Sequence, residues 1–329
     1  MGAPILNDQE FIELWNKHKS ASLVAKALDM DLSMVHRRRR RLEARYKIAL
    51  VSDHVKGRPY DALQTHHRHS ARLNLGIRNG TVIVFSDAHF WPGIRTTAFK
   101  GLLWAIKELK PKAVICNGDA FDGASISRYP RIGWDNKPSV IEELHACQAY
   151  LSEIEETAKK ALHNVKLIWT LGNHDARFET RLATVAREYA CVHGFHLKDH
   201  FPAWEACWAA WINEGEAKTP TVIKHRYKGG AHATHNNTMG AGTHMVTNHL
   251  HAAKVTPYSD YNGTRYGVDT GCLADPDGAQ FLDYSEDNPR NHRSGFVVLT
   301  FREWKLMLPE LVLVWDQNHV EFRGDLHKV

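Results

Sequence analysis

The chain has 329 residues, of which 43% are hydrophobic and 24% are charged, the composition of a soluble globular protein whose core needs no disulfide to fold. Its five cysteines are odd in number and scattered, with no Cys-x-x-Cys pair, which argues against a zinc ribbon or disulfide framework and indicates a reducing compartment. Residues 1–80 hold 15 of the 42 Lys and Arg residues but only 8 of the 37 Asp and Glu residues. The remaining residues hold 27 Lys and Arg and 29 Asp and Glu. The basic surplus therefore lies in the N-terminal quarter, where a polyanionic partner is expected to bind.

No signal for secretion or membrane insertion is visible in the sequence. The N-terminus lacks the basic-then-apolar pattern of a signal peptide, and no apolar run approaches the ~20 residues of a membrane span. We therefore expect a cytoplasmic protein that has no membrane partner.

Residues 8–48 carry apolar side chains at helical spacing and predict three short helices. Ser22 is expected to cap the second helix and Ser33 the third, after a tight turn at residues 30–33. The third helix would turn Val35 and Leu42 inward and a run of arginines outward. The arginines expected to contact nucleic acid are Arg37, Arg38, Arg40, Arg41 and Arg45.

Two short helices joined by a tight turn, the second strongly basic, are typical of a helix-turn-helix, and residues 25–30 resemble the segment before the turn in DNA-binding modules of this kind. We therefore interpret residues 1–50 as a helix-turn-helix whose basic helix contacts DNA. Two alternatives stay open: a solvated basic face, or a docking surface for an acidic protein partner.

Residues 51–79 lack sustained periodicity and are interpreted as a linker that packs partly on the following domain. The cluster at residues 66–69 holds three histidines and one arginine. No acidic or cysteine partner accompanies it, so polar linker is preferred over a metal site.

From residue 81 onward, short apolar strands alternate with helices. The first strands are predicted at residues 82–85, 113–116 and 165–169, and the helices between them at residues 97–109 and 139–162. This order predicts right-handed parallel units with functional loops at the carboxyl ends of the strands. Residues 176–217 are predicted to be helical, with Trp204, Trp208 and Trp211 on an apolar face. Later strands are predicted at residues 221–224, 245–247, 295–300 and 311–315.

Residue types that bind metal ions follow five of these strands. They are Asp87 and His89, Asp119 and Asp122, Asn173 and His174, His225, and His249 and His251. An Asp-x-His on an extended segment places both side chains on one face, so both can reach one ion. Carboxylate, amide and imidazole groups suit borderline divalent ions such as Mn²⁺, Fe²⁺ or Zn²⁺, without a thiolate.

This order of motifs resembles the calcineurin-like metallophosphoesterase family. The motifs stand here as Asp87-Ala88-His89, Gly118-Asp119-Ala120-Phe121-Asp122, Gly172-Asn173-His174-Asp175, His225 and Asn248-His249-Leu250-His251. Asn248 stands where the family usually has glycine, and His225 is preferred over His232, His235 and His244 because it directly follows a strand. The resemblance implies an α/β fold over residues 80–329, in which two central sheets are flanked by helices.

The resemblance also implies a role for each motif residue. Asp87, His89, Asp119 and His251 would hold one divalent ion, and Asp119, Asn173, His225 and His249 a second, with Asp119 bridging. We expect Mn²⁺, with Fe²⁺, Zn²⁺ or Ni²⁺ as alternatives, and a water that bridges both ions as the nucleophile. Asn173 would also donate to a phosphate oxygen. His174 would be the general acid or charge stabiliser near the leaving group and Asp122 its orienting partner; alternatively, His174 is a structural histidine in the ligand loop.

Two arginines outside the ligand motifs are candidates for contact with the substrate. The loop at residues 127–134 carries Arg128 with Tyr129 and Trp134, which suits gripping a phosphodiester and stacking a base, or is an ordinary surface loop. Arg177 is a second candidate phosphate contact, or a solvated arginine at a helix start. In motif order the chain resembles SbcD-type DNA repair nucleases, and the combination also resembles metallophosphoesterases of bacteriophages.

A DNA nuclease is therefore the leading hypothesis, because a basic module precedes a phosphoesterase site. The alternative is a phosphomonoesterase or cyclic-nucleotide phosphodiesterase with an N-terminal targeting module. A third possibility, a DNA-binding regulator with an inactive phosphoesterase domain, is disfavoured by the full ligand set.

Overall fold

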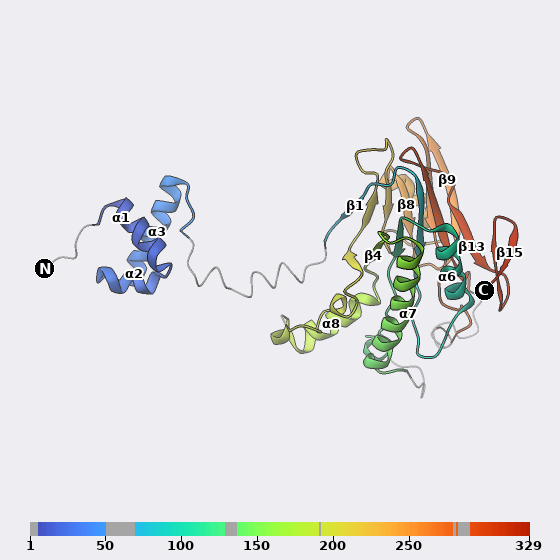
Figure 1. Ribbon diagram of the computed structural model, residues 1–329, viewed down its shortest axis with the longest axis horizontal. Helices are drawn as coiled ribbons and strands as arrows, with labels where there is room; N and C mark the ends of the chain where they lie inside the picture. Colours follow the sequence, from blue (N-terminus) through green and yellow to red (C-terminus); the bar gives the residue numbers. More distant parts are fainter. Residues whose placement is uncertain (1–5, 51–69, 129–136, 191, 279–280, 282–289) are drawn as a thin grey trace. The chain divides into compact units, whose positions relative to one another are not determined.

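The computed structural model describes residues 6–50, 70–128, 137–190, 192–278, 281 and 290–329. The histidine cluster at 66–69 and the aromatic part of the predicted 127–134 loop lie outside these residues. The chain divides into two compact units, residues 1–68 and 69–329 (Figure 1). Within the described ranges, no helix is long and apolar enough to cross a membrane.

The described part of the N-terminal unit, residues 6–50, contains three helices, α1 (Asp8–His18), α2 (Ala21–Leu28) and α3 (Leu32–Tyr46). They pack around a small core made by Phe11, Trp15, Val24, Leu28, Val35, Leu42 and Leu50. The predicted caps were wrong, because α2 and α3 begin earlier than expected. Ser20, not Ser22, precedes α2, and the Asp31 carboxylate caps α3 by accepting the Ser33 backbone N–H at 2.8 Å.

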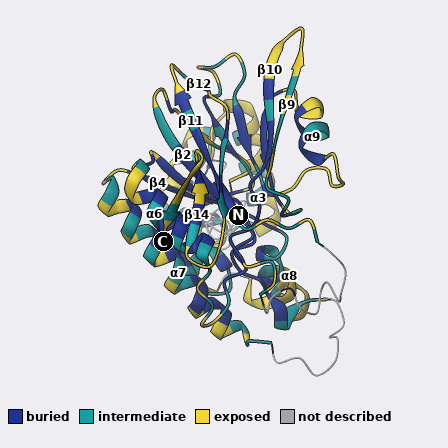
Figure 2. Cartoon of the chain, turned by 90° about the vertical axis from the view of Figure 1, so that its right-hand side faces the viewer, coloured by how far each residue is buried: buried dark blue, intermediate teal, exposed yellow. Residues whose placement is uncertain are grey.

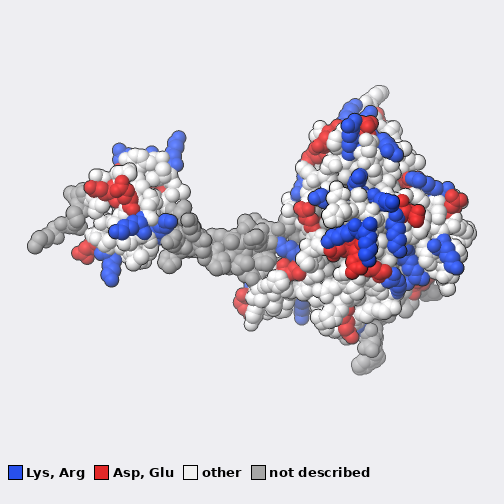
Figure 3. Space-filling model, viewed as in Figure 1, with Lys and Arg blue, Asp and Glu red and all other residues white. Residues whose placement is uncertain are grey.

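The arginines of α3 are not uniformly directed outward. The Arg38 guanidinium lies 4.9 Å from the centre of the Phe11 ring and 3.7 Å from Asp8, and its side chain is only 17% exposed. Arg41 and Arg45 also lie within 3.8 and 3.1 Å of Asp8, although their side chains remain 66% and 65% exposed. Acidic side chains accordingly lie beside basic ones on the face of this unit drawn in Figure 3. Arg38 therefore serves the packing of this unit, which a helical-wheel argument could not detect.

The second unit is built from two sheets. In sheet order, the first consists of β15 (Asp325–Lys328), β14 (His319–Phe322), β13 (Glu310–Val314), β11 (Gly295–Arg302), β2 (Gly80–Phe85), β3 (Ala113–Cys116), β4 (Lys166–Thr170) and β5 (Glu205–Cys207), while β12 (Lys305–Leu306) pairs with β11. The second consists of β1 (Leu73–Leu75), β6 (Ala210–Ile212), β7 (Thr221–Ile223), β8 (His244–Thr247), β10 (Gly263–Asp269) and β9 (Lys254–Asp260). Strands β2, β3 and β4 are parallel to one another, as the alternating pattern predicted. Strand β5 is parallel to β4, whereas β2 pairs antiparallel with β11.

The central strands are apolar on both faces because each face packs on a different partner. Ile83 and Phe85 of β2 belong to the core that includes α6 (Thr97–Leu109) and α7 (Val140–Ala161). Val82 and Val84 point the other way, since successive strand residues alternate, and pack in the core shared with the second sheet. Figure 2 shows buried residues concentrated in the strands, whereas the helices also carry exposed ones. The predicted fold class, two sheets flanked by helices after a helical N-terminal segment, is confirmed.

Residues 176–217 differ from the expectation of continuous helix. Only α8 (Asp175–Val185) is α-helical; 3₁₀ turns at Arg187–Tyr189 and Leu197–His200 follow, and then strands β5 and β6. Trp204 is buried, whereas Trp208 is 48% exposed. The spacing of the tryptophans imitates a helical period, but pairing of β5 with β4 and of β6 with β7 decides the backbone conformation.

The predicted linker at residues 51–79 ends earlier than expected, because Leu73–Leu75 form β1 and pair in parallel with β6. Helix α9 (Ala233–Ala241), the β9–β10 hairpin and strands β14 and β15 were not predicted either. These elements are short or carry weak apolar patterns, so sequence periodicity gives little signal for them.

Candidate active site

The candidate site lies where the carboxyl ends of strands from both sheets meet. Strands β2, β3 and β4 are adjacent and parallel, so the loops that carry Asp87, Asp119 and Asn173 leave the same edge of the first sheet. In the second sheet β7 and β8 are also parallel neighbours, and His225 and His249 follow their ends. The fold thereby brings together motif residues that are separated by up to 164 positions in the sequence.

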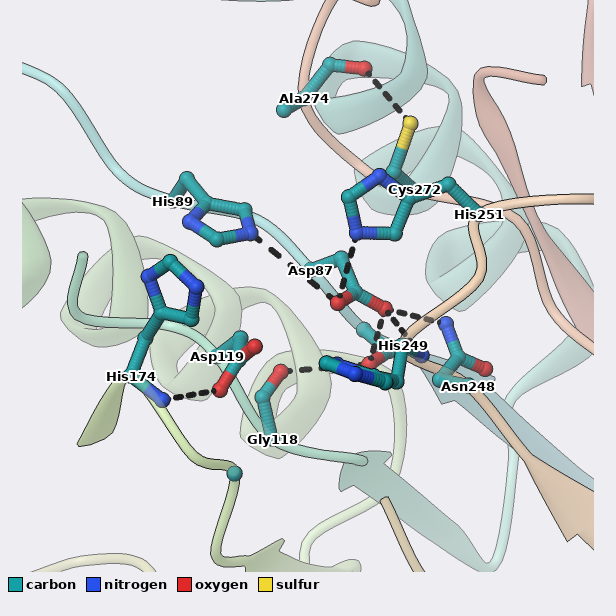
Figure 4. A network of polar contacts seen from close by, with 12 residues as sticks. Asp87, His89, Gly118, Asp119, His174, Asn248, His249, His251, Cys272 and Ala274 are labelled. Carbon is teal, nitrogen blue, oxygen red and sulfur yellow. Dashed lines mark hydrogen bonds and ion pairs between the residues drawn. The ribbon is translucent and has the colours of Figure 1, made fainter. Parts of the chain in front are cut away.

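The predicted ligands form two groups whose ligand atoms lie within 4.8 Å of one another: Asp87, His89 and His251 in one, and Asp119, His225 and His249 in the other. In the first group, His251 Nε2 is 3.0 Å and His89 Nε2 4.0 Å from Asp87 Oδ1. In the second, His225 Nε2 is 3.1 Å from Asp119 Oδ2. Figure 4 shows the side chains of His89, His249 and His251 near the Asp87 and Asp119 carboxylates.

The donor set fits a pair of divalent ions. The Asn173 carboxamide oxygen is buried and has no hydrogen-bond partner among the described residues. A buried polar atom without a partner is costly, and coordination of an ion would remove that cost. Carboxylate, imidazole and amide donors, with no thiolate, match the preference of Mn²⁺, Fe²⁺ and Zn²⁺.

The backbone of the ligand loops is strained at the ligands themselves. Asp87, His89, Asp119, His249 and His251 have φ values of +47°, +40°, +53°, +78° and +57°. Residues with a side chain rarely adopt this left-handed region, and each instance costs on the order of 1–3 kcal/mol. Backbone hydrogen bonds between the loops hold the conformation, including Asp87 N–H to Gly118 O and His89 N–H to Asp119 O, both at 3.0 Å.

Two glycines make this close approach possible. A Cβ atom on Gly172 would lie 1.9 Å from Asp119 Oδ1. A Cβ atom on Gly118, whose φ is +86°, would lie 2.6 Å from His225 Nδ1. The glycines of the second and third motifs are therefore required by the packing of Asp119 and His225.

Asp122 connects the ligand His89 to the candidate acid His174. Its Oδ1 atom lies 2.8 Å from His89 Nδ1 and 2.7 Å from His174 Nδ1. Burial opposes ionisation, but the hydrogen bonds from His174 and His89 hold the pKa of Asp122 well below its usual range. Burial also opposes the charged form of His174, yet Asp119 and Asp122 outweigh it and raise the pKa of His174. This arrangement fits Asp122 as an orienting group.

Arg177 is not a solvated arginine, because its guanidinium contacts Asp122 and His174. Its Nη1 atom donates to the Asp122 carbonyl at 2.9 Å, and its Nη2 atom lies 3.0 Å from His174 Nε2. Its side chain is 22% exposed. Arg128 is exposed, and most of the loop that follows it lies outside the described residues.

Comparison with known families decides the identity of this site. The family model for calcineurin-like phosphoesterases matches residues 80–252, which include all seven predicted ligands. The chain belongs to the calcineurin-like phosphoesterase family.

Two solved structures are distantly similar to this phosphoesterase. Vps29 of Chaetomium thermophilum is 9% identical with a TM-score of 0.36, and the match covers 76% of this chain and 97% of Vps29. A dimetal phosphatase from Danio rerio is 9% identical with a TM-score of 0.32, covering 72% and 96%. No curated protein sequence matches this chain significantly.

Asn248, which departs from the family's glycine, takes part in the phosphoesterase site. Its side-chain NH₂ donates to Asp87 Oδ2 at 2.5 Å and to the Gly271 carbonyl at 2.6 Å. Its Oδ1 atom accepts the backbone N–H and the hydroxyl of Thr270 at 3.0 and 2.7 Å. The amide thus ties the ligand Asp87 to the loop after β10, and only the departure from the family pattern marked this position in the sequence.

Two further carboxylates hold the ligand loops, and sequence reasoning gave them no role. Asp175 accepts four hydrogen bonds, from the backbone of Asp119, Gly172 and Phe121 and from the Trp169 indole. Glu143 of α7 accepts the backbone N–H groups of Gly123 and Ala124 at 2.7 and 3.0 Å, directly after Asp122. Burial, reinforced by Asp122, raises the pKa of Glu143 to about 7. Asp175 was visible as the last residue of its motif, but Glu143 lies in a helix with no motif around it.

Metal binding to this phosphoesterase is expected to release protons. Burial opposes the charged form, but attraction to Asp119 and Asp87 raises the pKa of His225 to about 10, and Asp87 likewise raises that of His251. His225 is therefore a doubly protonated imidazolium in the metal-free protein at neutral pH, and a metal must displace the Nε2 proton, while the raised pKa of His251 acts in the same direction. The Mn²⁺ affinity should rise from about pH 6 to about pH 8, with proton uptake by the buffer visible in titration calorimetry. A binding enthalpy that is independent of the buffer's ionisation enthalpy would contradict this expectation.

Proposed function

We propose that this phosphoesterase is a divalent-metal-dependent phosphodiester hydrolase that acts on DNA. The observation that carries the proposal is the presence, on one chain, of a phosphoesterase site and a helical unit whose third helix exposes arginines. Arg37, Arg40, Arg41 and Arg45 are exposed on α3, which begins three residues after α2 ends. Exposed arginines at this spacing suit contact with successive phosphates.

Seven side chains are proposed to hold the ions. Asp87, His89, Asp119 and His251 would bind the first, and Asp119, Asn173, His225 and His249 the second, with Asp119 shared. A bound pair of divalent ions would supply an activated water and neutralise charge on the phosphate. We propose Mn²⁺ for both positions.

The chain's own residues would then orient the ester and handle the proton of the leaving group. A hydroxide, formed when a water loses a proton to the solvent, would attack phosphorus through its oxygen. The bond from phosphorus to the leaving oxygen would break, and His174 would give that oxygen a proton. Asp122 fixes the His174 ring through Nδ1, which leaves Nε2 as the donating atom. Because Arg177 lies 3.0 Å from that atom, its guanidinium must shift when the ester binds, and the phosphate is a natural new partner for it.

Replacement of His174 by alanine tests this assignment. We expect kcat on DNA with Mn²⁺ to fall by about 10²–10⁴-fold, the usual contribution of a general acid, while the bound metal content stays unchanged. His145→Ala, on the exposed side of α7, is the matched control. The assay should cover single- and double-stranded DNA, RNA, cyclic dinucleotides and a phosphomonoester. Activity of the His174→Ala variant within a factor of three of wild type would contradict the assignment.

The second candidate is a phosphomonoesterase or cyclic-nucleotide phosphodiesterase whose N-terminal unit only localises it. The three-arginine cluster around Asp8 favours this alternative, because part of the basic charge of α3 is already neutralised. Charge reversal of Arg37 and Arg40, the exposed arginines of α3 for which no ion pair with Asp8 is found, discriminates the candidates. A loss of salt-sensitive DNA binding supports the nuclease, whereas unchanged DNA hydrolysis, or activity on monoesters alone, supports the alternative.

A further inference from the structure

The segment that follows His225 combines exposed positive charge with an exposed aromatic ring. Between Glu216 and Asp260 the sequence contains no acidic residue, and its Lys and Arg residues are Lys218, Lys224, Arg226, Lys228 and Lys254. Arg226, Tyr227 and Lys228 are exposed and follow directly after the buried His225. Positive side chains are therefore concentrated in the segment that follows His225, and the sequence between Glu216 and Asp260 supplies no carboxylate to offset them.

Tyr227 is arranged as a platform and not as a core residue. Its side chain is 48% exposed. The Lys224 and Lys228 ammonium groups lie 5.9 and 5.5 Å from the centre of its ring. Proteins that bind single-stranded nucleic acids combine an exposed aromatic ring with flanking cations, because a base stacks on the ring while the cations contact the backbone phosphates.

The platform is held in place before any ligand arrives. Asn237 of α9, which is 1% exposed, accepts the Lys228 backbone N–H at 2.9 Å and donates to the Lys228 carbonyl at 3.2 Å. The same amide lies 3.4 Å from the Thr247 hydroxyl, two residues before His249. One buried side chain therefore fixes this loop relative to the strand that leads to a ligand.

The chain geometry also places the platform close to the reacting phosphate. Tyr227 is two residues from His225, and two residues of chain span at most about 7 Å. A strand whose scissile phosphate lies at the second ligand group would thus pass over Arg226, Tyr227 and Lys228. Base faces are available for stacking only where the strand is unpaired.

We propose that Arg226, Tyr227 and Lys228 form a subsite that binds single-stranded nucleic acid next to the scissile phosphate, with the base on Tyr227 and the phosphates on the two cations. The subsite rests on the proposed phosphodiesterase function and names the part of the substrate that the site selects. It distinguishes a nucleotide strand from a small diester that lacks a base.

The test compares an oligothymidylate with bis(p-nitrophenyl) phosphate, using the full chain with Mn²⁺. Tyr227→Ala should raise KM for the oligonucleotide by about 5- to 100-fold and leave kcat/KM for the small diester within twofold. Tyr227→Phe keeps the ring and should behave like wild type. Lys228→Glu should raise the oligonucleotide KM and flatten its salt dependence, whereas Lys160→Glu, on the exposed end of α7, should change neither.

The outcomes separate this subsite from the proposed function. If wild type hydrolyses the small diester but not the oligonucleotide, the DNA-directed function fails and the subsite fails with it. If the oligonucleotide is hydrolysed but Tyr227→Ala has a wild-type KM, only the subsite is refuted. An equal loss on both substrates refutes it too, because Tyr227 would then only support His225.

Discussion

Replacing Asp119 by alanine is expected to abolish hydrolysis of every phosphoester. Asp119 is 1% exposed, and its Oδ2 atom lies 3.1 Å from His225 while its Oδ1 atom accepts the His174 backbone N–H at 2.8 Å. It belongs to the ligand group of His225 and His249 and also forms a further group with His89 and His174. Because His89 is itself a member of the first ligand group, loss of the Asp119 carboxylate is expected to weaken both ion positions.

The expected size of the fall in activity follows from the charge stabilisation that the ions supply. A loss of about 4 kcal/mol of transition-state stabilisation corresponds to a roughly thousandfold fall in kcat, and we expect at least this much. Metal content by mass spectrometry should fall together with activity, while circular dichroism shows a folded protein. Asp325→Ala, an exposed aspartate on β15, is the matched control. If Asp119→Ala kept a tenth of the wild-type activity, the shared-ligand arrangement would be wrong.

Replacing Asp175 by alanine is expected to cause the largest loss of stability of any single substitution in the site. Four buried donors would lose their acceptor: three backbone N–H groups of the ligand loops and the Trp169 indole. Each unsatisfied buried donor costs about 1–3 kcal/mol, so the total should be about 4 kcal/mol or more. For a unit of this size the melting temperature should fall by about 10 °C or more.

Asp175→Asn is the matched control, because its single carbonyl oxygen can keep the three bonds to Oδ2 and lose only the Phe121 bond. Burial, reinforced by Asp119, raises the pKa of Asp175 to about 6. A carboxyl whose pKa is raised by folding stabilises the fold below its unfolded pKa, and this contribution is lost as pH rises through about 6. The difference in unfolding free energy by which Asp175→Asn is less stable than wild type should therefore be smaller at pH 8 than at pH 5. Equal melting temperatures for wild type and Asp175→Ala would contradict the role of Asp175 as the acceptor that holds the ligand loops.

The N-terminal helices and the parallel strands β2, β3 and β4 could be predicted because their signals are local. An apolar run of four to six residues, followed by polar residues, marks a buried strand and its loop wherever the partner strand lies. The motif residues Asp87, Asp119 and His251 could be named for the same reason, since each stands at a strand end. A three-residue strand such as β1 or β6 has no period of its own, and only its partner makes it a strand.

The sequence by itself determined the alternation of strands and helices from β2 to β4, the chemistry of the ligand types and the edge of the sheet at which they gather. Only the tertiary structure decided that Asn248, Asp175 and Glu143 hold the ligand loops. It also decided that Arg177 contacts His174 and that Asp8 pairs with three arginines of α3. The physical reason is that hydrogen-bond and ion-pair partners are chosen by distance in space. The sequence around a buried acceptor such as Glu143 shows no local pattern that identifies its hydrogen-bond partners. The apolar residues around it do show a pattern, which identifies a buried element.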